Sequence, residues 1–270
     1  MKFINYLVTL FFQINLSYSF YPKTILSKIS IHHFRNKYKH HEKVGYKKSK
    51  QILFKHFKNL IIYGDSNNEL TENINCEHIW CQKYFNYQEP MKSDLHILYL
   101  SNSKLNSHRN DFKFSDIYLN YTNIDIQGNK INMSHSSPFN IIYKKNTNKK
   151  IFEPYYTSKG KVVRSLAYFY IIYDDKQNNL DKLIDIDNLL TWNRNHIPDI
   201  KEIQRNEIIY LYQNNINPFI KYPILVEIIF NHQFNIIPFI KLSFITLYSI
   251  IISNIFKFYY KIIEIKKYDK

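Results

Sequence analysis

Residues 75–114 read NCEHIWCQKYFNYQEPMKSDLHILYLSNSKLNSHRNDFKF and hold the densest cluster of chemically capable side chains in this sequence. Glu77 is followed directly by His78, and Asp94 stands two residues before His96. Because neighbouring side chains of a strand point to opposite faces, Glu77 and His78 can meet at one site only where the chain bends. The adjacent pair therefore predicts a bend or turn at this point.

A second group of polar residues lies at helical spacing near the end of this stretch. Asn106 precedes Arg109 by three residues and Asn110 by four, so one helix face presents an amide and a guanidinium. Cleavage of a phosphodiester needs a base for water, a hard cation, and a donor that holds the phosphate. His78 titrates in the range of such a base, and Glu77 has the oxygens that Mg²⁺ prefers. Taken singly, each pattern is also typical of a solvated pair or a wet helix face.

Three segments of this stretch resemble the signature of the endonuclease I family, secreted bacterial nucleases of the His-Me finger (ββα-metal) fold group. The family couples Asn-x-Glu-His to Met-x-Ser-Asp-Leu-His-x-Leu and then to Asn-x-x-Arg-x-Asn-Phe-x-Phe. Here the segments follow in the same order as NCEH, MKSDLHIL and NSHRNDFKF, residues 75–78, 91–98 and 106–114. The likeness continues through residues 152–169 and 189–223, so it covers roughly residues 50–230.

The resemblance implies an α+β fold in which a His-Me finger nuclease core is joined by additional helices and short strands. It implies that His78 is the general base that activates water. Glu77 and Asn106 would ligate one divalent cation, Mg²⁺ or else Ca²⁺ or Mn²⁺, and Arg109 matches an arginine that helps to hold the phosphate. The polar residues that we expect to support the site from beside it are Asp94, His96, Asn110 and Arg164.

The activity that the resemblance implies is hydrolysis of DNA, and in several members of RNA, without sequence preference and with 5′-phosphate ends. Weak sequence readout is physically reasonable, because phosphate contacts position a nucleic acid without identifying its bases. We expect the protein to be a monomer. The alternative is a catalytically silent nucleic-acid-binding module that retains the fold.

Some positions near the signature depart from the family's spelling. Cys81 and Leu100 stand where the family has prolines, and Ile97 stands where it has a second histidine. These changes surround the implied site without removing the base or the metal ligands. Cys76 and Cys81, the two cysteines of the chain, form one local bridge or stay reduced, and the sequence leaves both open.

The positive charge of the chain lies mainly at its two ends. The 270 residues carry a formal net charge of +15, of which residues 51–237, the expected nuclease domain, contribute only +2. Residues 20–50 contribute +8 and residues 238–270 contribute +4. Bulk charge is therefore not the footprint of nucleic-acid binding by the central domain. The hydrophobic share of 45% excludes wholesale disorder.

The two ends have the patterns of addresses and anchors. Residues 1–19 are typical of a secretory signal peptide, with a buried N-terminal helix as the alternative. Residues 20–50 are basic and contain one acid, so they form either the plastid transit part of an apicoplast-type leader or a solvated linker. Residues 242–256 run 15 positions without a charge, short of the roughly 20 of a spanning helix. This segment, within the tail 238–270, is a membrane anchor, a docked helix or a terminal extension.

Periodicity within the central domain predicts both helices and strands. Residues 161–173 are apolar on most faces and predict a buried helix, while residues 52–63 predict an amphipathic one. Residues 200–214 predict a third helix, and residues 139–143 a short strand. The side chains of the third helix that share helical spacing are Ile203, Glu207, Ile208 and Leu211.

Overall fold

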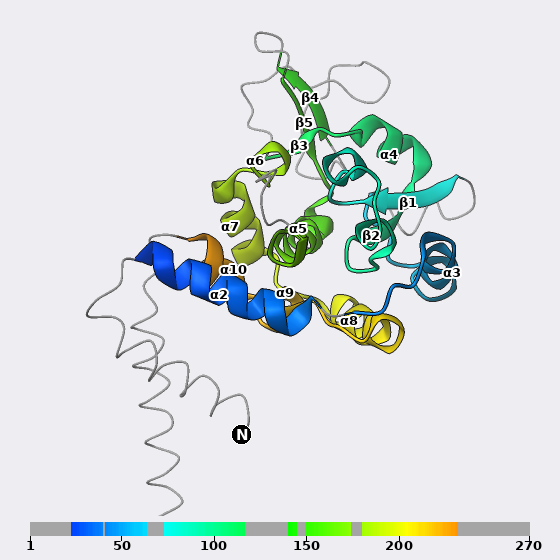
Figure 1. Ribbon diagram of the computed structural model, residues 1–270. Helices are drawn as coiled ribbons and strands as arrows, with labels where there is room; N and C mark the ends of the chain where they lie inside the picture. Colours follow the sequence, from blue (N-terminus) through cyan, green and yellow to red (C-terminus); the bar gives the residue numbers. More distant parts are fainter. Residues whose placement is uncertain are drawn as a thin grey trace, which may run out of the picture. The chain divides into compact units, whose positions relative to one another are not determined.

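The computed structural model describes six segments of the chain, which together contain every residue of the expected site (Figure 1). The described segments are residues 23–39, 41–63, 73–116, 140–144, 149–173 and 180–231. The expected signal peptide, residues 1–19, and the uncharged segment 242–256 lie outside them. Within the described segments, no helix has the length and apolar character needed to cross a membrane.

Two antiparallel strands and a short helix form a ββα unit. Strand β1 (Ile74–His78) pairs with β2 (Leu98–Asn102), and helix α4 (Ser103–Arg109) follows β2 directly. The helix begins there because the side chain of Asn102 accepts hydrogen bonds from two backbone N–H groups of its first turn. The order strand, strand, helix agrees with the core that the resemblance implies.

The connection between β1 and β2 contains two 3₁₀ helices, η1 (Gln82–Phe85) and η2 (Met91–Ser93). Trp80 fastens this connection to the helical part of the core by stacking on Phe169, with ring centroids 4.3 Å apart. The packing of Trp80 therefore fixes the position of this connection, although the connection contains no long helix or strand.

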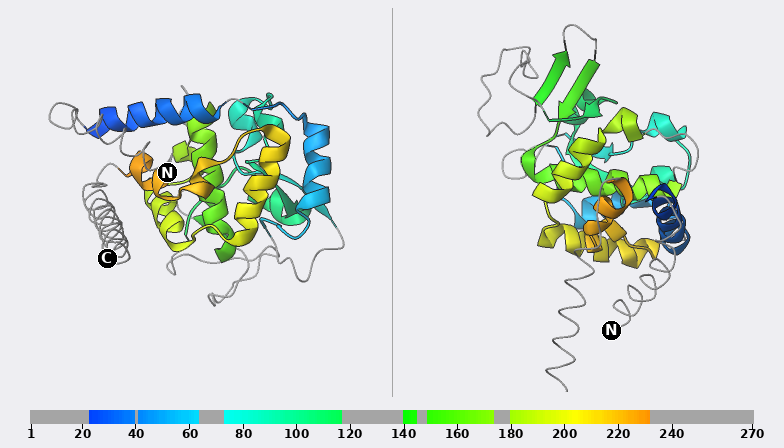
Figure 2. Two further views of the ribbon diagram at one scale, coloured as in Figure 1. Left: turned by 90° about the horizontal axis from the view of Figure 1, so that it is seen from below. Right: turned by 90° about the vertical axis from the view of Figure 1, so that its left-hand side faces the viewer.

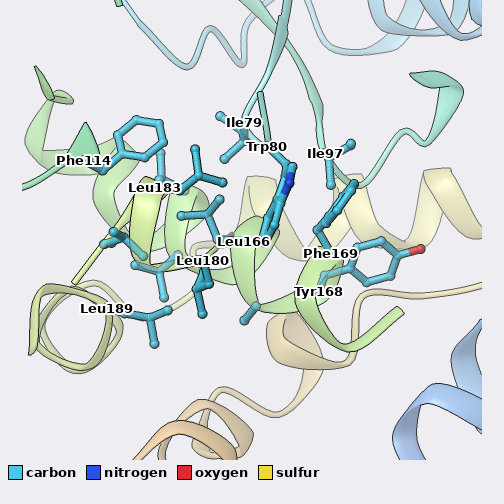
Figure 3. Packing of buried hydrophobic residues seen from close by; sticks show 14 of the residues in the cluster. Ile79, Trp80, Ile97, Phe114, Leu166, Tyr168, Phe169, Leu180, Leu183 and Leu189 are labelled. Atoms are coloured by element: carbon cyan, nitrogen blue, oxygen red, sulfur yellow. The ribbon is translucent and has the colours of Figure 1, made fainter. Parts of the chain in front are cut away.

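Helix α5 (Lys159–Tyr173) lies at the centre of the larger hydrophobic core, as the apolar run 161–173 predicts. Twelve of its 15 residues are buried. Figure 3 shows its side chains meeting Trp80 of the β1–β2 connection and Leu183 of α6 (Leu180–Leu183). Helices α2 (Lys23–Tyr38), α7 (Ile186–Asn195) and α9 (Pro218–Lys221) are among those that pack against α5. Helices packed around α5, together with separate short strands, make the fold α+β.

A second small sheet has the order β3-β5-β4. Strand β3 (Lys113–Phe114) runs parallel to β5 (Lys149–Glu153), and β4 (Asn140–Lys144) pairs with β5 antiparallel. Strand β4 confirms the strand predicted at residues 139–143. Strand β3 comes soon after α4, so the chain enters this second sheet directly from the ββα unit.

The helix predicted over residues 52–63 is wrong in its bounds. Helix α3 spans Tyr46–His56, and the chain then turns. Ile61 forms a β-bridge with Leu100, and the backbone N–H of Ile62 donates to the carbonyl of Leu100 at 2.9 Å. The β-branched end of the predicted helix therefore joins the edge of β2, where a neighbouring strand outweighs its helical spacing.

Helix α8 (Ile200–Gln213) confirms the helix predicted at residues 200–214, but the face that it buries is different. Ile203 and Leu211 are 40% and 78% exposed. The buried side chains are instead mainly polar: Glu202, Arg205, Asn206, Ile209 and Gln213. Polar residues can occupy this face because the core supplies their hydrogen-bond partners.

Residues before the expected domain boundary at residue 51 pack against the core. Helix α2 lies beside α5 and α10 (Ile224–Phe230) (Figure 2), and its Phe34 contacts the core cluster. Arg35 donates through Nε to the carbonyl of Ile171 at 2.7 Å. Ile31 of α2 also packs on this cluster, so any leader that is removed without uncovering this surface has to end before Ile31. The division into residues 20–50 and 51–237 stays a prediction.

Candidate active site

An open hollow of about 280 Å³ lies between the end of β1, the connection after it and helix α4. The expected site residues that line it are Glu77, His78, Asn106, Arg109 and Asn110. Three further expected residues, Asp94, His96 and Arg164, are absent from this lining. Folding thus gathers the implied base, the two implied metal ligands and the arginine at one place.

Glu77 and His78 are the last two residues of β1, and the strand ends directly after them. The pair is therefore still in extended backbone, and the expected bend follows it. Both residues nevertheless line the hollow, because the connection and α4 close around the end of the strand.

His78 is held as a neutral imidazole with a defined orientation. Its Nε2 lies 2.9 Å from the carbonyl oxygen of Lys92, and its ring stacks on Tyr46 with centroids 5.7 Å apart. A carbonyl accepts only from a protonated nitrogen, so Nε2 carries the hydrogen and Nδ1 keeps its lone pair. Burial lowers the pKa of His78 to about 4. At neutral pH the ring is therefore ready to accept a proton at Nδ1.

Glu77 is a nearly buried carboxylate, 4% exposed, with an incompletely compensated charge. Its Oε1 accepts a 3.0 Å hydrogen bond from the hydroxyl of Tyr63 and lies 3.1 Å from Nη1 of Arg109. Burial raises the pKa of Glu77 even though Arg109 and Tyr63 act to lower it. A cation in the hollow would stabilise this carboxylate further.

Arg109 ties the end of α4 to the end of β1. Its Nη2 donates to the carbonyl of Ile79 at 2.9 Å, and its Nη1 donates to that of Asn110 at 3.1 Å. The guanidinium also lies over the ring of Phe114, 4.5 Å from the centroid. Arg109 is buried, and its Nε has no hydrogen-bond partner within the described segments. These contacts show it positioning the two strand-end residues; its expected contact with a phosphate stays a prediction.

The side chain of Asn106 is fixed through its Nδ2, so its amide oxygen is the polar atom left to meet a ligand. Its Nδ2 donates to Oδ1 of Asn75 at 2.9 Å and to the carbonyl of Cys76 at 3.2 Å. A carboxylate and an amide oxygen on one hollow form a hard donor set, which fits Mg²⁺ because that ion keeps several waters. The described residues contain no group of three or more His, Cys, Asp or Glu side chains placed to hold a metal. The donor set thus fits a cation held by two protein oxygens and water.

Asp94 and His96 belong to a closed polar cluster in the core, here called the Asp94 network. The Oδ1 of Asp94 accepts from the backbone N–H of His96 at 2.8 Å and from Nε2 of Gln213 at 3.0 Å. Its Oδ2 accepts from the hydroxyls of Tyr168 and Tyr173 at 2.8 and 2.6 Å. Each carboxylate oxygen of Asp94 thus accepts two hydrogen bonds from protein donors.

The charge of Asp94 is well compensated in spite of its burial. Burial raises the pKa of a carboxyl group, but the imidazoles of His96 and His41, with the hydrogen bonds, outweigh this effect and lower the pKa of Asp94. Burial also lowers the pKa of His96 to about 4. The network therefore stabilises a charged carboxylate in the core and joins segments that lie far apart in the sequence.

Arg164 joins two helices away from the hollow. Its Nε and Nη2 donate to the two carboxylate oxygens of Glu202 at 2.8 and 2.5 Å, and its Nη1 donates to the carbonyl of His196 at 2.7 Å. The bidentate pair links α5 to α8. Gly160, one turn earlier, is required there, because an added Cβ would lie 2.3 Å from the carbonyl oxygen of His196.

Sequence reasoning missed three aromatic residues at the site: Tyr46, Tyr63 and Tyr87. Tyr46 stacks on His78, Tyr63 donates to Glu77, and Tyr87 lines the hollow. No local pattern marks them among the 24 tyrosines of the chain. Their positions depend on which segments fold beside β1.

Comparisons with known proteins match the chain to one family model and to two curated relatives. The family model described as Endonuclease I matches residues 16–224. The extracellular ribonucleases of Bacillus amyloliquefaciens and Bacillus subtilis (strain 168) are each 30% identical to the chain over 165 residues. The match covers 55% of this chain and 51% of each relative, so the chain spans about half the length of the curated relatives it matches.

Proposed function

Because the chain belongs to the endonuclease I family, we propose that it is a metal-dependent endonuclease of the His-Me finger type that hydrolyses DNA and RNA without sequence preference. The observation that carries this proposal is the hollow in which Glu77, His78 and Asn106 meet. RNA is included because the two matched relatives are extracellular ribonucleases.

His78 supplies the base in this mechanism. Its neutral Nδ1 takes a proton from the attacking water, and the resulting hydroxide adds to phosphorus as the bond to the 3′-oxygen breaks. The 3′-oxygen leaves with the electron pair of that bond and takes a proton from solvent water, so the other product end is a 3′-hydroxyl. The hydrogen bond from Nε2 to the carbonyl of Lys92 keeps the ring in the correct tautomer as it becomes positive. The product strand carries a 5′-phosphate.

The remaining residues hold the site in shape. Glu77 and Asn106 would hold a divalent cation, which when bound takes up negative charge from the phosphoryl oxygens. Arg109 keeps Glu77 and the carbonyl of Ile79 in fixed relation, and we propose that its positive charge also stabilises the phosphate. Asp94, His96 and Arg164 stabilise the surrounding fold, and Asn110 forms part of the wall.

A catalytically silent nucleic-acid-binding module is the competing function. Such a module needs positive charge to bind phosphates but has no use for a buried, neutral imidazole. The presence of His78, Glu77 and Asn106 on one hollow therefore favours an enzyme.

We further propose that the protein enters the secretory pathway through residues 1–19 and acts as a monomer. The matched relatives are extracellular proteins by name. Secretion or delivery to a secondary plastid (apicoplast), and membrane association through residues 242–256, are the destinations that its terminal segments would permit.

The test uses the full chain in a plasmid-nicking assay and a parallel RNA-hydrolysis assay. We expect activity with Mg²⁺, loss of activity in excess chelator, and a loss of roughly 10²–10⁴-fold in His78→Ala. Lys201→Ala, an exposed change on α8, serves as the matched control and should cleave normally. Full activity in chelator, or in His78→Ala, contradicts the mechanism.

A further inference from the structure

The rim of the hollow carries an exposed aromatic side chain that the proposed chemistry does not use. Tyr87 is 60% exposed and shares the lining of the hollow with Glu77 and His78. The other large hydrophobic side chains exposed within the described segments are not part of this lining. Single exposed rings are common on protein surfaces, so the position of Tyr87 and its backbone carry the argument.

The backbone of Tyr87 is held in a conformation that its side chain disfavours. Asn86 and Tyr87 have φ angles of 53° and 57°, in the left-handed region. Asparagine tolerates this region, but a residue with a large side chain is strained there. The backbone N–H of Tyr87 donates to the carbonyl of Gln82 at 3.1 Å, which keeps the turn closed after η1. Such strain persists where the surroundings enforce it, most often at functional sites.

The turn that bears Tyr87 is fastened to the proposed base. Phe85, two residues earlier, is buried, and its ring centroid lies 6.1 Å from that of His78 and 5.6 Å from that of Phe169. Lys83 on the same 3₁₀ helix forms an ion pair with Asp111, which follows α4. The turn that carries the exposed ring of Tyr87 is therefore held in place on both sides of the hollow, by the contact of Phe85 with His78 and by the ion pair of Lys83 with Asp111.

We propose that Tyr87 is a stacking platform for a nucleobase next to the scissile phosphate, so that the enzyme prefers unpaired strands of RNA or DNA to duplexes. This inference rests on the proposed function. Stacking tolerates any sequence, because every base has a π-face. A base within a duplex is already stacked and paired, and it must be extruded before its face can meet Tyr87.

The test compares Tyr87→Gly and Tyr87→Trp in the full chain. Glycine removes the ring and also relieves the positive φ, so this variant should melt at the same or a higher temperature than the unmodified chain. Binding is measured in excess chelator by the anisotropy of a fluorescein-labelled mixed-sequence oligonucleotide, single-stranded or annealed. We expect the single-strand Kd of Tyr87→Gly to rise roughly 5- to 150-fold while its duplex Kd changes little. Tyr87→Trp should keep single-strand binding.

Tyr210→Ala is the matched control, because Tyr210 is 49% exposed on α8 and does not line the hollow. It should leave both Kd values unchanged. Unchanged single-strand binding by Tyr87→Gly, or an equal rise in both Kd values, overturns the stacking role. Cleavage assays on the same oligonucleotides separate the two proposals: an unmodified chain that binds single strands through Tyr87 but cleaves neither substrate contradicts the nuclease function alone.

Discussion

The hollow and the Asp94 network both place a carboxylate near a histidine, but their surroundings compensate the charge of that carboxylate to different degrees. Four protein donors meet the carboxylate oxygens of Asp94, and the surroundings lower its pKa. Burial raises the pKa of Glu77, because Arg109 and Tyr63 compensate its charge only in part. A fully compensated carboxylate holds a fold together, whereas an under-compensated one beside an open hollow can bind a cation.

The largest expected effect comes from replacing His78 and His96, one at a time, with asparagine. His78→Asn should lower kcat roughly 10²–10⁴-fold, because it removes the base, while His96→Asn should leave kcat of the folded enzyme near the unmodified value. Single-turnover cleavage of a labelled oligonucleotide measures both. Equal losses of kcat would mean that the two histidines do not differ in role.

Removing the carboxylate of the network should affect stability more than chemistry. Asp94→Ala removes the carboxylate that accepts from the hydroxyls of Tyr168 and Tyr173 and from the amide of Gln213, so we expect the free energy of unfolding to fall by about 3 kcal/mol. Urea denaturation measures this change. Asp181→Ala, an exposed substitution on α6, is the control and should stay within about 0.5 kcal/mol.

Acid should destabilise the protein through the two buried histidines. Burial lowers the pKa of both His78 and His96 to about 4, so between about pH 6.5 and pH 4 the unfolded chain binds more protons than the folded one. Stability is therefore complete above pH 6.5 and should decline by about 1.4 kcal/mol per pH unit for each histidine as pH falls toward 4. Urea denaturation across this range tests the slope, which should be smaller in His96→Asn. A slope that is the same in that variant would show that other groups cause it.

The smallest expected effect is stabilisation by the cation. Mg²⁺ at ten times its Kd should add about 1.4 kcal/mol to the unfolding free energy, because it binds the folded state alone. Asn106→Ala should abolish this gain, and Asp94→Asn, which alters the closed network, should retain it. A gain that survives Asn106→Ala would place the cation elsewhere.

The parts that sequence patterns predict well are those whose signal is local. The apolar run of α5 forms a helix wherever a core is available, and the helical spacing of Asn106 and Arg109 is confirmed by α4. Local patterns fail where a distant partner decides. The apolar spacing of α8 suggests a buried face with Ile203 and Leu211, but Arg205 turns inward because the carbonyls of Leu95 and Leu98 accept its hydrogen bonds.

The sequence by itself determined the order of the ββα unit, the central helix and five of the residues that line the hollow, because each depends on spacing within a few turns or on a family signature. Only the tertiary structure decided that one acid–histidine pair lines an open hollow while the other is enclosed in the core. The donors that close the Asp94 site come from far along the chain: Tyr168 lies 74 residues away and Gln213 lies 119 residues away. Among the described residues no comparable set closes around Glu77, so the physical difference between a structural carboxylate and a proposed metal ligand arises only when those segments pack.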